Sequence, residues 1–95
     1  MTIDEFRATL QNAAPPDSSA PLQALWHDAR GDWNRAHEIA QDIDDEMGAW
    51  IHAYLHRKEG DAGNAAYWYR RARQPVASDS LEDEWTRIAT ALLTH

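Results

Sequence analysis

The sequence predicts an all-α fold of six helices, and three observations lead to this prediction. A pattern of the form Ala-x-x-His-x-x-x-Gly-Asp-x-x-x-Ala runs from Ala24 to Ala36 and recurs 29 residues later, from Ala53 to Ala65. A repeat at a fixed period of about 20 to 50 residues is typical of stacked helical units, which bury their apolar stripes against their neighbours. Apolar residues also recur at helical spacing along the chain. No segment shows the alternation of a half-buried strand.

The N-terminal part predicts a helix over residues 3–12 and a linker over residues 13–19. Thr2 and Glu5 have the spacing of a capping box, which begins the helix. The linker contains two prolines, and a proline disfavours helix in the residue before it. The apolar stripe of this first helix consists of Ile3, Phe6 and Leu10.

Residues 20–75 predict two units, each made of a helix, a Gly-Asp turn and a second helix. Gly31 and Gly60 end the first helix of each unit, because glycine readily adopts the left-handed conformation found there. Asp32 and Asp61 then cap the second helices. The four apolar stripes are Leu22, Leu25, Trp26 and Ala29; Trp33, Ala36, Ile39, Ala40 and Ile43; Met47, Trp50, Ile51, Tyr54 and Leu55; and Ala62, Ala65, Ala66, Tyr69 and Ala72.

The remaining boundaries are predicted from capping residues. Ser18 or Ser19 is expected to cap the first repeat helix. The acidic run over residues 42–46 is interpreted as the end of one helix and the capped start of the next, where carboxylates suit the helix dipole, rather than as a cation site. Ser78 or Ser80 caps the last helix, within residues 76–95. The stripe of this C-terminal capping helix is Leu81, Trp85, Ile88, Ala89 and Leu92.

Composition narrows the classes of function. The chain has 95 residues, which we interpret as a single domain, 1–95, with a formal net charge of −7 that argues against a nucleic-acid partner. It contains no cysteine, which excludes disulfides and thiolate chemistry. No apolar run approaches a membrane span, and the acidic N-terminus lacks the features of a signal peptide. We therefore expect a cytoplasmic protein, and the abundance of arginine over lysine suggests a bacterial source.

The second unit resembles a tetratricopeptide repeat. The resemblance rests on a Gly-Asp turn followed by a small residue, an aromatic, an alanine and a proline: Gly60, Asp61, Ala65, Tyr69, Ala72 and Pro75. Ala53 stands where the family places a small residue in the first helix. The first unit matches less fully, since Ala40 replaces the aromatic. The period is 29 rather than about 34 residues, so the connection after Ile43 must be tight.

This resemblance, over residues 20–75, implies two tetratricopeptide-like helix-turn-helix hairpins flanked by an N-terminal and a C-terminal helix. Two units are fewer than the roughly three that such stacks require. Either the terminal helices cap the repeats, or a homodimer completes the core.

The resemblance also implies a partner surface on the concave side, which the first helix of each unit lines. In the second unit the residues expected there are Trp50, Tyr54, Arg57 and Lys58, which form the predicted contact set; in the first unit they are Leu25 and Asp28. An aromatic pair beside two cations suits an acidic or C-terminal peptide segment. The alternative is that Trp50 and Tyr54 belong to the core. The resulting prediction is a non-catalytic protein–protein interaction module that binds no nucleic acid, membrane, metal or cofactor.

The histidines provide the alternative function, a small metal- or ligand-binding protein built on His27, His52 and His56. His52 and His56 are four residues apart and share a helix face, a spacing that can hold zinc or copper. His27 and His56 are equivalent across the repeat, which favours a packing role instead. Catalysis is not expected, because the serines occupy caps and no glycine-rich loop is present.

Overall fold

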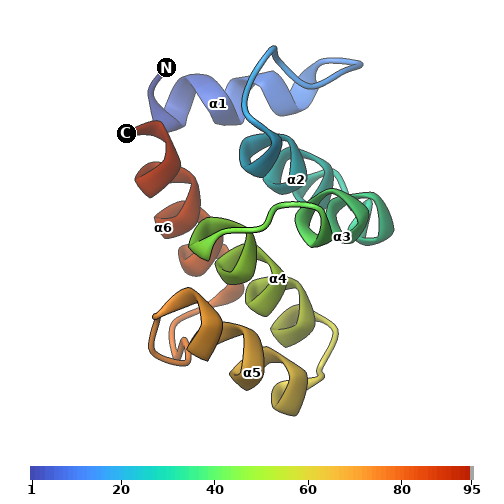
Figure 1. Ribbon diagram of the computed structural model, residues 1–95. Helices are drawn as coiled ribbons and strands as arrows, with labels where there is room; N and C mark the ends of the chain where they lie inside the picture. Colours follow the sequence, from blue (N-terminus) through green and yellow to red (C-terminus); the bar gives the residue numbers. More distant parts are fainter. Residues whose placement is uncertain (95) are drawn as a thin grey trace.

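The computed structural model describes residues 1–94, and over this range it contains six α-helices and no strand, which confirms the predicted fold class (Figure 1). A single short 3-10 helix, η1, follows the first α-helix. In chain order the elements are α1 (Ile3–Ala8), η1 (Thr9–Gln11), α2 (Ala20–Ala29), α3 (Trp33–Gln41), α4 (Glu46–Lys58), α5 (Ala62–Ala72) and α6 (Leu81–Leu93).

Most of the predicted caps are present. Thr2 and Glu5 form a complete capping box at α1. The side chains that accept a hydrogen bond from the third residue of their helix are Asp32, Asp45, Asp61 and Ser80. Ser19 precedes α2 but makes no side-chain cap bond. The acidic run at residues 42–46 therefore ends α3 at Asp42 and begins α4 behind its cap Asp45, as predicted.

The first helix is shorter than predicted. Its α-helical part ends at Ala8, and residues 9–11 continue as a 3-10 turn. The carbonyl of Thr9 accepts from the amide of Asn12 at 2.9 Å and from the indole Nε1 of Trp26 at 3.2 Å. A 3-10 turn is common at the end of an α-helix, and here it also places the Thr9 carbonyl against α2.

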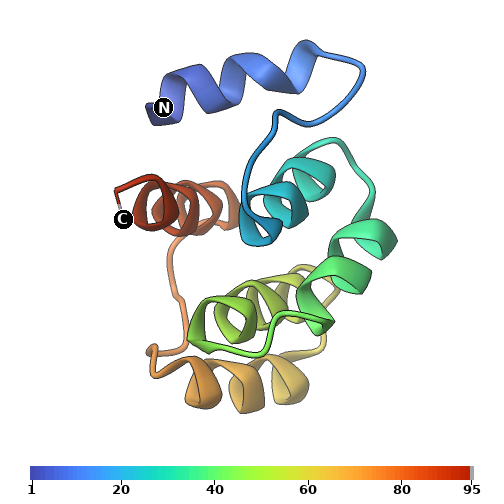
Figure 2. The ribbon, with the colours of Figure 1, turned by 45° about the horizontal axis from the view of Figure 1, so that its top comes forward.

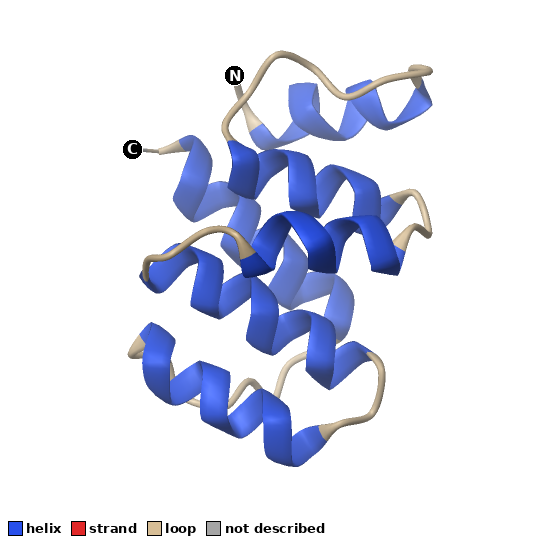
Figure 3. Cartoon of the chain, turned by 45° about the vertical axis from the view of Figure 1, so that its right-hand side comes forward, coloured by secondary structure: helices blue, strands red, loops and turns tan. Residues whose placement is uncertain are grey.

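The two Gly-Asp corners have the same geometry. Gly31 and Gly60 have φ angles of 84° and 89°, a left-handed conformation that glycine adopts without strain. At each corner the aspartate amide donates to the carbonyl five residues earlier, Asp32 to His27 and Asp61 to His56, both at 2.9 Å. Consecutive helices pack on one another, α2 on α3, α3 on α4 and α4 on α5, as Figure 3 shows.

The C-terminal helix crosses this series of helices. It packs against α1, α2 and α4. In Figure 2, α6 and α2 lie at one level, with α1 on one side of them and α4 and α5 on the other. The last helix therefore covers the face formed by α2 and α4.

The core is centred on α4. Every residue of α4 from Gly48 to His56 is buried, because α2, α3, α5 and α6 surround this helix. The apolar face predicted for this helix, with Ala49, His52, Ala53 and His56 beside it, lies within this buried region except for Met47. None of the helices in the described residues has the length and apolar character of a bilayer-crossing segment.

The connection between α3 and α4 is tight, as predicted from the shortened period. A Cβ atom added to Gly48 would lie 2.3 Å from the carbonyl oxygen of Ile43. The chain before α4 therefore passes directly over its first turn. This close approach requires glycine at position 48.

Candidate functional site

The four predicted contact residues lie on α4 and contact two buried carboxylates. Trp50 and Tyr54 are only 7% and 3% exposed, so they belong to the core, which was the alternative interpretation. The Nζ atom of Lys58 lies 3.0 Å from Oδ1 of Asp28, on α2. The Nη1 atom of Arg57 lies 2.8 Å from Oε1 of Glu84, on α6.

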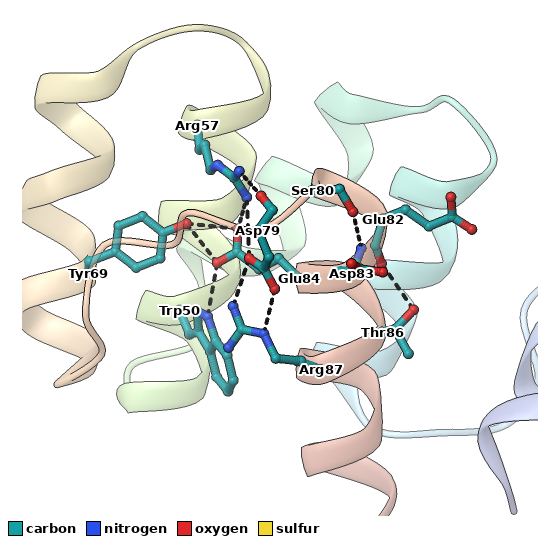
Figure 4. Close-up of polar contacts among 10 residues, drawn as sticks. All are labelled: Trp50, Arg57, Tyr69, Asp79, Ser80, Glu82, Asp83, Glu84, Thr86 and Arg87. Carbon is teal, nitrogen blue, oxygen red and sulfur yellow. Dashed lines mark hydrogen bonds and ion pairs between the residues drawn. The ribbon is translucent and has the colours of Figure 1, made fainter.

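Glu84 is the centre of a polar network between α4, α5 and α6 (Figure 4). Its side chain is fully buried, and Trp50 donates to its Oε2 at 3.2 Å. The hydroxyl of Tyr69 lies 2.6 and 2.8 Å from its two oxygens. Burial raises the pKa of Tyr69, and the hydrogen bond to Glu84 adds to this shift. The network anchors α6 on α4 and α5.

Asp28 is the second buried carboxylate. Its Oδ2 accepts from the hydroxyl of Tyr54 at 2.9 Å, while Lys58 neutralises its charge. Burial raises the pKa of Tyr54 strongly, and the adjacent carboxylate raises it further. Asp28 was expected on the concave surface, but the burial of neither carboxylate was predicted, because acidic residues in helices are mostly exposed to solvent.

A cavity of about 390 Å³ opens beside Asp28, between α1, α2, α4 and α6. Tyr54 and Lys58 line it, whereas Trp50 and Arg57 do not. The guanidinium of Arg7 lies 6.0 Å from the ring centre of Trp85 at this cavity. The remaining lining residues are Leu10, Asp28, Ala29, Leu81 and Glu82. The cavity combines an apolar wall with two cations and two carboxylates.

A second arrangement of interest is a cluster of three histidines on two helices. His37 comes from α3, and His52 and His56 come from α4. One potential ligand atom from each residue lies within 4.8 Å of those of the other two. The Nε2 atoms of His37 and His52 are 3.0 Å apart, a hydrogen-bond distance. His52 and His56 are buried, and His37 is half-buried.

Tryptophans hold two of the three rings in place. The ring of His37 stacks on Trp33 at 4.9 Å and that of His52 stacks on Trp68 at 3.9 Å, each with an interplanar angle of 10°. Burial lowers the pKa of His52 to about 4, with smaller contributions from the neighbouring histidines, and burial also lowers the pKa of His37. Both imidazoles are therefore neutral at neutral pH.

The structure brings together only two of the three histidines that the sequence suggested for a metal site. His52 and His56 do meet, but their partner is His37 rather than His27. His27 lies on α2 and packs edge-on against Trp26, with ring centres 5.1 Å apart. The repeat equivalence of His27 and His56 therefore holds for the backbone corner but not for the imidazole environment. The spacing of Trp33 and His37, four residues apart on one helix face, was the signal available in the sequence.

The class of protein that these observations define is a small all-helical protein with a half-open apolar cavity and a three-histidine cluster. No protein-family model matches the chain, and no curated protein or solved structure is significantly similar to it.

Proposed function

We propose that this protein is a small non-catalytic interaction module of tetratricopeptide-like architecture. Its partner would place a short segment, an apolar side chain followed by a carboxylate, in the cavity between α1, α2, α4 and α6. This proposal retains Tyr54 and Lys58 from the contact residues predicted from the sequence. We assign Trp50 and Arg57 a different role, because both are committed to Glu84.

The observation that carries the proposal is the position of Lys58 at the cavity. Its side chain remains 37% exposed although its ammonium group contacts Asp28. An ammonium group has three donors, so one ion pair leaves donors for a second acceptor. The apolar lining from Leu10, Leu81 and Trp85 would bury the preceding side chain of the partner.

Peptide binding to the purified protein tests this function. We expect short peptides that end in an apolar residue to bind when their C-terminal carboxylate is free. The same peptides should bind about tenfold more weakly when amidated, because the contact between the carboxylate and Lys58 is lost. The variant Lys58→Met keeps the apolar stem and should remove the difference. Arg35→Met, on α3 and away from the cavity, is the matched control. Equal affinity for free and amidated peptides, or no binding of either, would contradict the proposal.

A further inference from the structure

We propose that His37, His52 and His56 form a binding site for one zinc-type divalent metal ion. This site lies between α3, α4 and α5, apart from the cavity used in the proposed function, and the two proposals stand or fall independently. It differs from the metal set suggested by the sequence, since His37 replaces His27.

The spacing of the nitrogens fits a shared ion. Two imidazole nitrogens on one tetrahedral zinc, each at about 2.0–2.1 Å from the metal, lie about 3.3 Å apart. The Nε2 atoms of His37 and His52 are already 3.0 Å apart. One ring nitrogen of each histidine lies within 4.8 Å of those of the other two, so only small shifts of the rings would be needed to place them around one ion.

The hydrogen bond between His37 and His52 shows that a lone pair is available. A hydrogen bond between two ring nitrogens requires one of them to be an unprotonated acceptor. A metal ion placed between these nitrogens would replace that bond; the donor ring would then carry its proton on Nδ1, so that the Nε2 lone pairs of both rings face the ion. Neutral imidazole is the form that binds metals.

Glu59 supports the third ligand. Its Oε1 lies 2.6 Å from Nδ1 of His56, so the ligand atom that His56 would offer is Nε2. A carboxylate on the far nitrogen of a histidine fixes the tautomer and makes the ligand nitrogen more basic, an arrangement that recurs at zinc sites. The glutamate belongs to the same turn that leads into the second Gly-Asp corner.

The surroundings pre-organise the rings. Trp33, which stacks on His37, is itself anchored by a 2.8 Å hydrogen bond from its Nε1 to the carbonyl oxygen of Leu55. Trp68, which stacks on His52, carries the guanidinium of Arg71 5.0 Å from its ring centre. Ligands held in this way lose little conformational freedom when they bind an ion.

The site also has a route for an ion. His52 lines a cavity of about 410 Å³, which is also lined by three acidic residues, Asp44, Asp45 and Glu46, and by one cation, Arg71. Carboxylates at the edge of a cavity raise the local concentration of cations. Three protein ligands leave the fourth tetrahedral position for water or a small ligand from this cavity.

Zinc titration of the tag-free, chelator-treated chain by isothermal calorimetry tests the site. We expect one zinc ion per chain. His37→Gln should weaken binding at least about 100-fold, because it removes a direct ligand, whereas Glu59→Gln should weaken it about 10- to 100-fold, because it removes a supporting contact. His27→Gln is the matched control, since His27 occupies the repeat-equivalent position outside the cluster, and it should bind as the parent chain does.

Cobalt(II) binding provides a second measurement, which would give no signal if the three histidines served only in packing. Bound in place of zinc, it should give the visible absorption bands of a tetrahedral nitrogen-ligated ion, and these should disappear in His52→Gln. If a histidine variant unfolds, the Glu59→Gln variant still tests the proposal, because it retains all three ligands and removes only the contact that supports His56. Absence of stoichiometric zinc binding to the parent chain, or an equal loss in His27→Gln, would overturn the proposal.

Discussion

Arg57 on α4 and Glu84 on α6 form an ion pair with Nη1 and Oε1 2.8 Å apart, and this pair fixes the C-terminal helix on α4. Arg57 also donates to the backbone carbonyl of Asp79, which precedes α6. The carboxylate is fully buried, so its loss of hydration must be offset by the bonds from Trp50, Arg57 and Tyr69. A residue predicted to contact a partner thus has an internal role.

Replacement of Glu84 should strongly destabilise the fold. In Glu84→Gln the charge that neutralises Arg57 is lost and the hydrogen bonds that the carboxylate accepts are rearranged, which should cost about 2–4 kcal/mol in the free energy of unfolding. Urea denaturation followed by circular dichroism measures this. Glu82→Gln, on the same helix and exposed, should change stability by less than about 0.5 kcal/mol. Similar midpoints for the two variants would contradict the proposed anchor.

The two helical glycines should respond to alanine with opposite signs. At position 48 the added Cβ would collide with the carbonyl of Ile43, and we expect a loss of about 1–3 kcal/mol. At Gly63, in α5, nothing lies within 4 Å of the added Cβ, so alanine should stabilise by about 0.5–1 kcal/mol. Thermal unfolding of both variants measures the difference. A stabilising Gly48→Ala would show that the connection before α4 is looser than described.

Alkaline pH should destabilise the protein through Tyr54 and Tyr69. Their pKa values are raised in the folded state, whereas an unfolded tyrosine has a pKa of about 10. The stability contributed by the two protonated hydroxyls is therefore fully present below about pH 10 and is lost as the pH rises above it. One alkaline titration should record both tyrosinate absorbance and helical circular dichroism. We expect Tyr54 and Tyr69 to ionise only as the helical signal is lost. Complete ionisation of all the tyrosines with the helices intact would be the contrary result.

The two corner aspartates should contribute equally to stability. Asp32 and Asp61 each accept from the amide three residues later, at 3.1 and 3.2 Å, and follow glycines with nearly equal φ angles. Alanine at either position should cost about 1 kcal/mol, and the double variant should lose the sum, because the caps belong to different helices. Chemical denaturation of the three variants provides the comparison. A cost at only one position would mean that the corners are not equivalent.

Helix positions were predictable because their signals are local. Capping residues, the Gly-Asp corners and apolar spacing act within one or two turns, and five of the six helix starts carry a side-chain cap bond. The tight connection before α4 was also predictable, since the period of 29 residues is short while both Gly-Asp motifs are intact. Gly48 is the residue that makes this possible.

Contacts between distant helices were not predictable in the same way. Periodicity indicates which face of a helix is apolar but not which helix covers it. The placement of α6 across α2 and α4 brings Glu84 to Trp50, whereas the packing of α2 on α4 brings Asp28 to Tyr54. For the same reason the sequence did not show that His37 lies beside His52 and His56, because proximity across α3 and α4 is not visible in sequence.

The central claim is that the packing of α3 on α4 brings His37 and His52 together. The nuclear Overhauser effect between their ring protons, recorded on the chelator-treated protein, measures this most directly. Their ring centres lie 4.7 Å apart, whereas the residues are 15 positions apart in sequence. We predict cross-peaks between the two imidazoles, and further cross-peaks from His37 to Trp33 and from His52 to Trp68. Assigned spectra in which the imidazole of His37 shows no contact with His52 would contradict the packing and the metal site together.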